Sequence, residues 1–268
     1  MEARRPAADT QATTLLEAHG LSRSFRGLQA LVDYELRLEP LTIHGVIGPN
    51  GAGKTTLFHL LSGFLRPSSG TIAFDGHDIT GSKAFKVARL GIGRTFQNIR
   101  LFGELSVLDN VKIALQRQSH PSLLGTITSS PSFRRSEREL DERAMELLEL
   151  FGLAAQRDRS ARNLPYGDQR RLEIARAVGI RPKLLLLDEP NAGMNPIETQ
   201  ELLGLIRRLR DELRITVVLV AHDIPLVMNL CDRIQVLNYG RLIAEGDPSA
   251  VRMNKDVIAA YLGQARHA

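Results

Sequence analysis

The residues best suited to chemistry form one short stretch, Gly48-Pro49-Asn50-Gly51-Ala52-Gly53-Lys54-Thr55, followed by Thr56. The stretch matches G-x-x-x-x-G-K-[ST], in which backbone N–H groups point at phosphates, the lysine reaches the outer phosphates and the hydroxyl ligates Mg²⁺. Glycines suit such a loop because side chains would block the approach of the backbone. Alone, the stretch predicts a nucleoside triphosphate site, and a glycine-rich turn without a ligand is the alternative.

A second pair of chemical residues, Asp188 and Glu189, follows the apolar run Lys183–Leu187. Unpaired charges at the end of a buried strand are costly, so they need a cation or a polar cleft. The carboxyl ends of such strands are also where α/β sheets bind ligands. We expect Asp188 to hold Mg²⁺ through water and Glu189 to polarise the attacking water. The alternative is that the two acids only cap a loop.

Two further polar residues stand at comparable places. His222 follows the apolar run Thr216–Ala221, and Gln97 follows the strand-like run Gly91–Phe96. The histidine could contact a γ-phosphate, and the glutamine amide could contact Mg²⁺ or the attacking water. On spacing alone, His222 is more often a structural residue and Gln97 indicates nothing. The seven histidines and the single cysteine show no metal-ligand spacing.

Composition limits the classes of function. Lys and Arg number 35 against 30 Asp and Glu, a net charge of +5 that fits a polyanion, an anionic membrane surface, a nucleotide or simply a solvated basic surface. Aromatic residues make up only 5% of the chain and tryptophan is absent, which argues against stacking on single-stranded nucleic acid. The sole cysteine, Cys231, cannot form an intrachain disulfide. With no apolar run of membrane-spanning length or signal peptide, we expect the chain to stay where it is made.

The elements that must position these residues can be predicted from periodicity. A strand over Leu41–Ile47 should enter the phosphate loop, and a helix over Thr55–Ser62 should leave it with its N-terminus facing the phosphates. Antiparallel strands are predicted at Leu15–Phe25 and Ala30–Leu38 from the period-two alternation of the second. Other predicted elements are a strand at Thr71–Phe74, a helix at Pro196–Leu213, a hairpin of Ile234–Leu237 with Arg241–Ala244, and a closing helix at Asp256–Leu262.

Between Lys83 and Ile180 the pattern is mostly helical. Capping-box patterns predict helices that begin at Ser106 and at Ser136, and the serine-rich interval His120–Arg135 between them is predicted as loop. We therefore expect a helical subdomain, at about residues 98–180, inserted in an α/β core. Residues 1–13 are expected to form a flexible tail.

The order of these parts resembles the nucleotide-binding subunit of an ABC transporter over essentially the whole chain after the tail. The resemblance rests on the phosphate loop, Gln97, Leu164–Gln169, Leu184–Glu189, Ala192–Asn195 and His222. Within that family the chain is most similar to the larger ATPase of branched-chain amino-acid uptake systems. Three segments carry this finer resemblance: Tyr166–Arg176, Asn191–Pro196 and the ending Asp256–Gly263.

The resemblance implies an α/β fold, namely a P-loop NTPase core of ABC ATPase type with an antiparallel β subdomain and the inserted helical subdomain, over residues 14–268. It implies ATP and Mg²⁺ as cofactors, with Thr55, Gln97 and Asp188 at the metal and Glu189, His222 and Gln97 in hydrolysis. Phe25 would stack on adenine. The remaining nucleotide contacts would come from Gly48, Asn50, Gly51, Ala52, Gly53, Lys54, Thr55, Thr56 and Gly167.

The implied partners are a second ATPase subunit, transmembrane permease subunits and, indirectly, a solute-binding protein, at the cytoplasmic face of the inner membrane. Two ATPase subunits would close head to tail, so that Leu164–Asp168 of one, including Gly167, meets the phosphate loop of the other. Gln97 and Ile99–Phe102 would lie at a groove for a cytoplasmic helix of the permease. Nucleic acid is not an expected partner.

The chain departs from the usual family pattern at two places, and three alternative functions remain. Pro165 takes the place of the serine in the family's usual L-S-G-G-Q, which removes a serine hydroxyl and a backbone donor. Asn195 replaces the usual aspartate in the loop after Asp188 and Glu189. The same machinery could serve another cargo, such as urea, or lipopolysaccharide in an exporter. A soluble ABC-type ATPase acting on nucleic acid is permitted by the charge, but such proteins usually carry two cassettes or a long coiled coil. A nucleotide-binding regulator without hydrolysis conflicts with Glu189 and His222.

Overall fold

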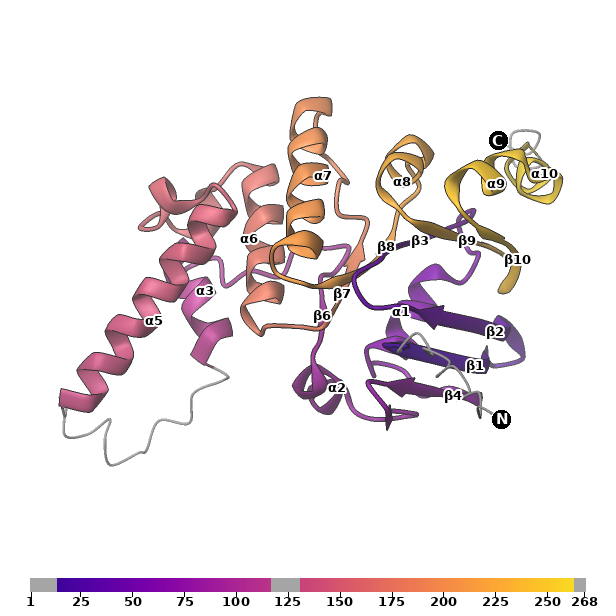
Figure 1. Ribbon diagram of the computed structural model, residues 1–268, viewed down its shortest axis with the longest axis horizontal. Coiled ribbons are helices and arrows are strands. Elements are labelled where there is room, and N and C mark those ends of the chain that lie inside the picture. Colours follow the sequence, from indigo (N-terminus) through magenta and orange to yellow (C-terminus); the bar gives the residue numbers. More distant parts are fainter. Residues whose placement is uncertain (1–13, 117–130, 263–268) are drawn as a thin grey trace, which may run out of the picture.

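The computed structural model describes residues 14–116 and 131–262. The predicted tail at residues 1–13, Gly263 and most of the loop predicted at His120–Arg135 lie outside these ranges. Within the described ranges the chain forms two sheets and a group of helices, which Figure 1 shows from the antiparallel sheet at the right to the helical part at the left.

The larger sheet has six strands in the order β10-β9-β3-β8-β7-β6. The five strands from β9 to β6 run parallel, and β10 pairs antiparallel with β9 at one edge. Its strands are β3 (Ile43–Ile47), β6 (Ile92–Arg94), β7 (Leu184–Asp188), β8 (Thr216–Val220), β9 (Arg233–Asn238) and β10 (Arg241–Gly246). The sheet therefore brings the ends of β3, β8, β7 and β6 to one edge.

Strand β7 shows why its sequence is a continuous apolar run. Leu185 and Leu187 belong to one hydrophobic cluster, whereas Leu184 and Leu186 belong to the other, and all four are fully buried. A strand covered on both faces needs apolar side chains at every position rather than at alternate ones. The predicted double-sided burial of this strand is confirmed.

The smaller sheet is antiparallel, in the order β2-β1-β4-β5. In β2 the residues Tyr34, Leu36 and Leu38 are buried while their neighbours along the strand are exposed, as the alternation predicted. The turn between β1 and β2 places Arg26 and Gly27 at positive φ. The strands are β1 (Leu16–Phe25), β2 (Leu28–Leu38), β4 (Ser69–Phe74) and β5 (His77–Asp78).

Helix α1 (Lys54–Leu61) lies between the two sheets (Figure 1). Its Leu57, Phe58 and Leu61 are fully buried in the cluster that also contains side chains of β1, β2, β7 and β8. The helix that leaves the phosphate loop is thus fixed on both sides, and the loop at its N-terminus is fixed with it.

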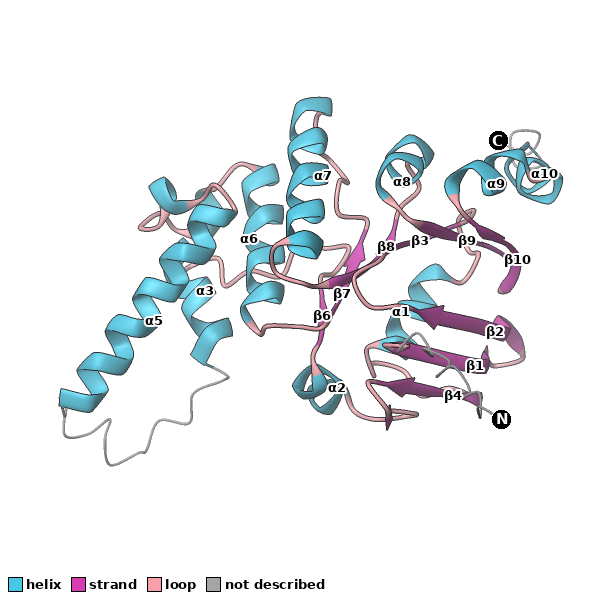
Figure 2. Ribbon diagram, viewed as in Figure 1, coloured by secondary structure: helices cyan, strands magenta, loops and turns pink. Residues whose placement is uncertain are grey.

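The helical part comes from the chain between β5 and β7, and most of it is drawn as cyan coils at the left of Figure 2, while its first helix, α2, lies below the centre. Its helices α3, α5 and α6 pack against one another, and α6 also contacts β6. Its elements are α2 (Ala84–Leu90), α3 (Val107–Gln116), α5 (Pro131–Leu150), the single 3-10 turns Ala154–Gln156 and Ala161–Asn163, and α6 (Tyr166–Gly179).

The two helix starts predicted here differ in outcome. Ser106 accepts the backbone N–H of Asp109 at 3.0 Å, and α3 begins directly after it, as predicted. The prediction that the next helix begins at Ser136 is wrong, because α5 begins at Pro131. Proline is favourable in a first helical turn, where its missing N–H has no partner to lose. The capping pattern at Ser136 therefore lies inside a helix.

After β7, the described residues up to 262 contain four further helices: α7 (Pro196–Asp211), α8 (Ile224–Leu230), α9 (Pro248–Met253) and α10 (Lys255–Leu262). Asn195 caps α7 by accepting N–H groups from Ile197 and Glu198. The sequence analysis missed the short helices α8 and α9. Each begins after an aspartate that caps it, Asp223 and Asp247, with a proline in the first turn, and this pattern could have revealed them.

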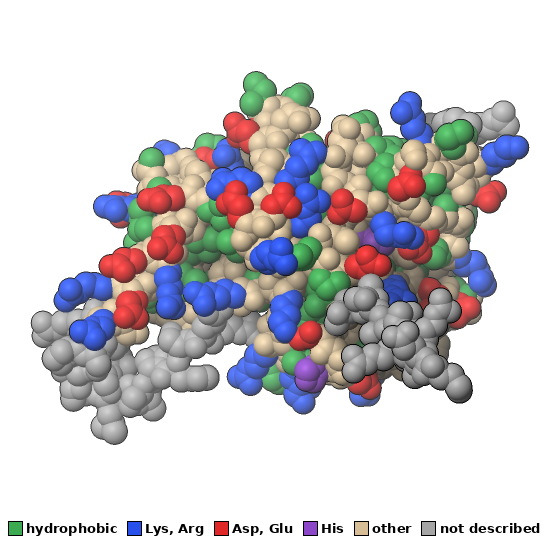
Figure 3. Space-filling model, in the orientation of Figure 1, with side chains coloured by type: hydrophobic (Ala, Val, Ile, Leu, Met, Phe, Trp, Pro, Cys, Tyr) green, Lys and Arg blue, Asp and Glu red, His purple; other side chains and the backbone are tan. Residues whose placement is uncertain are grey.

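Among the described helices, none is both long and apolar enough to cross a bilayer. On the face that Figure 3 shows, basic and acidic side chains are interspersed over the helices and no continuous basic stripe forms. This face gives no support to the nucleic-acid alternative.

Candidate nucleotide site

The phosphate loop joins β3 to α1 and holds its own lysine. Lys54 is only 7% exposed, and its Nζ donates to the carbonyl oxygens of Gly48 at 2.6 Å and Pro49 at 2.9 Å. Burial lowers the pKa of Lys54, while the nearby carboxylates Glu189 and Asp188 oppose that shift. The ammonium group is therefore positioned inside the loop before any phosphate arrives.

Packing explains two of the loop glycines and conformation explains the third. A Cβ at Gly53 would lie 2.5 Å from the carbonyl oxygen of Ala30. A Cβ at Gly48 would collide with the carbonyl oxygen of Leu237. Gly51 faces open space but has φ of +78°, which an L side chain rarely adopts. The loop is thus pressed against β2 and β9 on its outer side, which leaves the other side for a ligand.

Asp188 ends β7 and is 4% exposed. Its Oδ2 lies 3.3 Å from Nη2 of Arg94, and its backbone N–H donates to Oγ1 of Thr95 at 3.2 Å. Burial raises the pKa of Asp188, and Arg94 opposes that rise. The carboxylate is ion-paired with the Arg94 guanidinium and stands at the end of a strand that α1 packs against.

Glu189 stands between the two other predicted catalytic residues. Its Oε1 lies 3.5 Å from Nδ1 of His222, and its Oε2 lies 3.5 Å from Nε2 of Gln97. Its backbone has φ of +48°, a left-handed conformation uncommon for a side chain of this size, and its N–H donates to the carbonyl of Val220 at 2.8 Å. Strand adjacency brings the three residues together, because Gln97, Glu189 and His222 follow the neighbouring strands β6, β7 and β8.

The donor set near the loop suits magnesium. Thr55 is exposed in the first turn of α1, and with the Asp188 carboxylate and the Gln97 amide it would offer only oxygen ligands. Oxygen ligands with several waters are what Mg²⁺ prefers. No cluster of three or more His, Cys, Asp or Glu side chains within residues 14–116 and 131–262 offers an alternative metal site.

Phe25 and Asn50, both predicted to contact the nucleotide, are exposed. Phe25 ends β1 and is 38% exposed, and the guanidinium of Arg23 stacks 4.7 Å from the centre of its ring. Asn50 is exposed at the start of the loop, while Thr56 is partly buried. A ring of this exposure offers one face to a planar base.

Gly167 contacts α7 rather than the residues around the phosphate loop. It stands in the first turn of α6. The three atoms nearest to a Cβ added there all belong to Glu198, at the start of α7, and the nearest is 2.9 Å away. Tyr166 packs on Gly193 in the same way, because a Cβ there would lie 2.9 Å from the tyrosine ring. The segment around Gly167 thus forms one surface with the loop that follows Glu189.

The sequence analysis missed the pair that holds the chain around Gln97. Arg170 is fully buried in α6 and donates to the carbonyl oxygens of Phe96 at 2.7 Å and Gln97 at 2.9 Å. Glu173 accepts the backbone N–H groups of Phe96 and Arg100, both at 3.3 Å. An arginine and a glutamate three residues apart on the apolar side of a helix would have been the signal.

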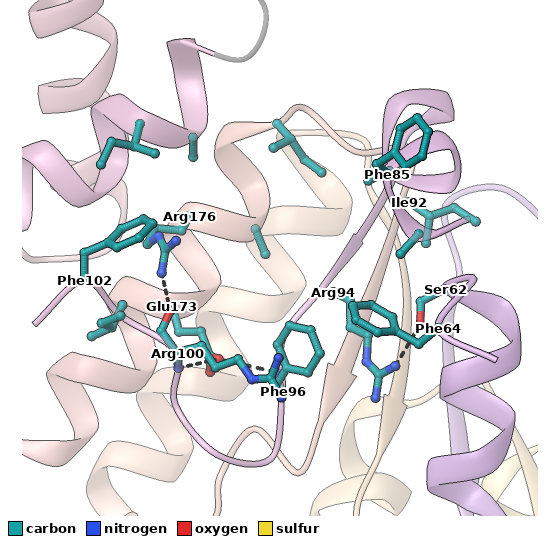
Figure 4. Close-up of a pocket in the computed structure, with 17 residues that line it drawn as sticks. Ser62, Phe64, Phe85, Ile92, Arg94, Phe96, Arg100, Phe102, Glu173 and Arg176 are labelled. Atoms are coloured by element: carbon teal, nitrogen blue, oxygen red, sulfur yellow. Dashed lines mark hydrogen bonds between the residues drawn. The ribbon is translucent and has the colours of Figure 1, made fainter. Parts of the chain in front are cut away.

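A groove of about 810 Å³ lies between α2, β6 and α6, and Figure 4 shows its wall. Phe64, Phe85 and Phe102, each nearly half exposed, line it together with charged side chains such as Arg100. Arg100, Leu101 and Phe102 line this groove, as expected of the segment after Gln97, and so does Phe96, whereas Gln97 and Ile99 are not among its lining residues. Gln97 instead turns toward Glu189.

Comparison with known proteins agrees with this geometry. Residues 31–192 match the family model described as "ABC transporter", and residues 241–267 match "Branched-chain amino acid ATP-binding cassette transporter". The chain is 48% identical to the high-affinity branched-chain amino acid transport ATP-binding protein BraF of Pseudomonas aeruginosa, over 94% of this chain and 98% of the relative. It is 47% identical to LivG of Escherichia coli, of the same description, with the same coverage.

A solved structure gives the same fold. The ADP conformation of MJ1267, an ATP-binding cassette of an ABC transporter, superposes with a TM-score of 0.81 at 29% identity, over 93% of this chain and 99% of that chain. Together with the family model, which covers more than half of the chain, these relatives settle the classification. The chain belongs to the family of ABC transporter ATP-binding proteins.

Proposed function

We propose that this protein is the ATP-hydrolysing subunit of an importer for branched-chain or related amino acids, bound to the cytoplasmic face of the inner membrane. The observation that carries the proposal is the placement of Glu189 between Gln97 and His222, at the sheet edge that also holds the phosphate loop. The printed names of the relatives supply the class of cargo.

Nucleotide binding is assigned to the loop and its surroundings. The backbone N–H groups of Gly51–Thr56 and the N-terminus of α1 face the phosphates, Lys54 bonds their outer oxygens, and Phe25 stacks on adenine. Thr55, Asp188 and Gln97 would hold Mg²⁺, which neutralises phosphate charge when bound. Asp188 is suited to this role because its buried carboxylate has a single guanidinium beside it.

Hydrolysis is assigned to the three residues around Glu189. The Glu189 carboxylate orients and polarises a water molecule, and its neighbours restrict where that water can sit. The His222 side chain is 63% exposed and can donate to a terminal phosphate oxygen. No covalent intermediate is needed, since phosphoryl transfer to water depends on positioning and charge stabilisation.

The site is proposed to work only within a pair of ATPase subunits. Gly167 is buried against Glu198 at the start of α7, whereas the adjacent Tyr166 is exposed, so Tyr166 presents this segment to a second subunit's phosphate loop. The aromatic groove is proposed to receive a cytoplasmic helix of the permease. Its three half-exposed phenylalanines offer an apolar surface, and Arg100 adds a charge that can fix the register of the helix.

The test of the chemistry is Glu189→Gln, which keeps the shape of the side chain and removes its charge. Loss of a general base costs about 10²–10⁴-fold in rate, so the variant should bind ATP with wild-type affinity and hydrolyse it at least about 100-fold more slowly. Glu212→Gln, an exposed change at the end of α7, is the matched control and should leave the rate unchanged. Wild-type ATPase activity in the Glu189→Gln protein would disprove the assignment.

The test of the cargo is reconstitution of the ATPase subunits with the permease and the solute-binding protein in vesicles. Leucine, isoleucine or valine should stimulate ATP hydrolysis, and Glu189→Gln should abolish the stimulation. A panel in which these three do nothing while urea or another solute works would replace the proposed cargo. Stimulation lost only after nuclease treatment would favour the soluble alternative.

A further inference from the structure

Arg94, the last residue of β6, has an environment that the chemistry assigned above does not use. Its guanidinium is 4% exposed and lies against three aromatic rings, 5.7 Å from the centre of Phe58, 5.6 Å from Phe64 and 5.0 Å from Phe96. Among the described residues its buried Nε has no hydrogen-bond partner. The side chain is therefore held mainly by the rings and by its two terminal nitrogens.

The two terminal nitrogens of Arg94 point to different sites. Nη1 donates to Oγ of Ser62 at 2.7 Å, a contact drawn as a dashed line in Figure 4. Nη2 lies 3.3 Å from Oδ2 of Asp188. Ser62 lines the groove, whereas Asp188 belongs to the nucleotide site, so one guanidinium joins the two.

Two of the three rings around Arg94 also line the groove. Phe64 and Phe96 line the groove, and their rings meet edge to face with centres 5.4 Å apart (Figure 4). Phe64 is 49% exposed to the groove. A segment that enters the groove must contact Phe64, and a shift of this ring changes the contacts of the guanidinium behind it.

We infer that Arg94 is a positioning residue that links occupancy of the groove to the orientation of the Asp188 carboxylate. The inference rests on the proposed function, because it takes Asp188 as a magnesium ligand. A buried carboxylate needs a cation and fixed donors to stay ionised and oriented. The planar guanidinium of arginine stacks on rings and holds its N–H donors in a fixed fork, whereas the ammonium of lysine is a compact point charge on a flexible stem.

The test measures binding rather than turnover. The affinity of the purified protein for a fluorescent ATP analogue is measured while Mg²⁺ is titrated, and again in EDTA. The measured quantity is the Mg²⁺ concentration that gives half of the full effect on nucleotide affinity. Asp188→Asn should raise this concentration strongly, and Arg94→Lys should raise it about tenfold. In EDTA, the affinity of Arg94→Lys for the nucleotide should change less than twofold. Ser62→Ala, which keeps the charge and removes one anchor, should raise it about threefold. Melting temperatures confirm that each variant is folded.

A pair of phenylalanine variants separates this link from general damage to the groove. Phe64→Leu removes a ring that touches Arg94, whereas Phe85→Leu removes a groove ring that Arg89 stacks on, at 5.8 Å, instead. Both rings are 49% exposed. Phe64→Leu should raise the half-effect concentration of Mg²⁺ about threefold, and Phe85→Leu should leave it unchanged.

The outcomes distinguish the failure of this inference from that of the proposed function. If Asp188→Asn has no effect on the Mg²⁺ dependence, the proposed role of Asp188 is wrong and the inference falls with it. A different result overturns only the inference: Asp188→Asn raises the half-effect concentration of Mg²⁺, but Arg94→Lys leaves that concentration unchanged or lowers it. Equal shifts in Phe64→Leu and Phe85→Leu would also overturn it.

Discussion

Arg170 and Glu173 lie one turn apart on α6, and Nη1 of the arginine donates to Oε2 of the glutamate at 2.7 Å with both side chains at most 5% exposed. Burial raises the pKa of Glu173, and Arg170 opposes that rise. The pair directs its remaining hydrogen bonds to the backbone of residues 96–100. The strength of this pair therefore decides where Gln97 stands.

Breaking this pair should be costly. Arg170→Met leaves the Glu173 carboxylate buried without its cation, which costs about 3–5 kcal/mol. Its neighbour Arg171→Met is the matched control, because Arg171 is 25% exposed and should lose about 1 kcal/mol or less. Urea unfolding of the two variants measures the difference, and values within about 1 kcal/mol of each other would contradict a structural role for the pair.

Replacing the loop lysine should abolish nucleotide binding without unfolding the protein. Lys54→Ala removes the ammonium that now bonds to Gly48 and Pro49, so ATP should bind at least about 100-fold more weakly, by the loss of a charged hydrogen bond to phosphate. Because burial lowers the pKa of this lysine, its removal also relieves a desolvation cost. Equilibrium binding of a fluorescent ATP analogue measures the effect. Lys183→Ala, at an exposed ion pair, should bind ATP normally, and wild-type affinity in Lys54→Ala would refute the assignment.

Two glycine-to-alanine changes should act in opposite directions. Gly53 has φ of +105° and no room for a Cβ beside Ala30, so Gly53→Ala should lower the free energy of unfolding by about 1–3 kcal/mol. Gly204 lies inside α7, where a Cβ added to it would have nothing within 4 Å. Gly204→Ala should therefore raise stability by about 0.5–1 kcal/mol. Thermal unfolding of both tests this, and a stabilised Gly53→Ala protein would show that the loop does not need its glycine.

Acid should destabilise the fold through His44. This side chain on β3 is 1% exposed, and burial lowers its pKa to about 4 from 6.5. Between those values the unfolded chain binds a proton on this ring that the folded protein does not, so the free energy of unfolding falls as the pH is lowered, by at most about 1.4 kcal/mol per unit. In His44→Met this contribution disappears, whereas His77→Met, at an exposed histidine, should keep it. Urea unfolding at pH 4.5 and 6.5 gives the comparison, and identical pH slopes for wild type and His44→Met would rule it out.

The sequence predicts those parts of the site that follow strands. Lys183–Leu187 and Thr216–Ala221 are uniformly apolar, so parallel strands covered on both faces can be expected, and the polar residues after them must meet at one edge. The structure places Glu189 and His222 together at that edge. Their catalytic roles stay a prediction that Glu189→Gln will test.

The parts that could not be predicted depend on contacts between distant segments. Arg94 gives no local signal beyond the nearby Phe96, because the other two rings and the carboxylate come from α1, the loop after it and β7. The predicted start of α5 is wrong because a capping pattern at Ser136 competes with a proline at a favourable position, and local rules do not rank the two. The backbone of Gln97 is held by Arg170 and its amide lies 3.5 Å from Glu189, and both partners come from segments 73 and 92 residues further along the chain, which local patterns do not predict.

The pairing of β6 with β7 has a consequence for how this chain can change. Ile92 stands beside Leu184 in parallel register, so the long excursion between these strands leaves and re-enters the sheet at a single seam. Segments of such an excursion can gain or lose residues without altering the order of the strands. The excursion is therefore the part of the chain that can change in length while the strands that hold the nucleotide site keep their order.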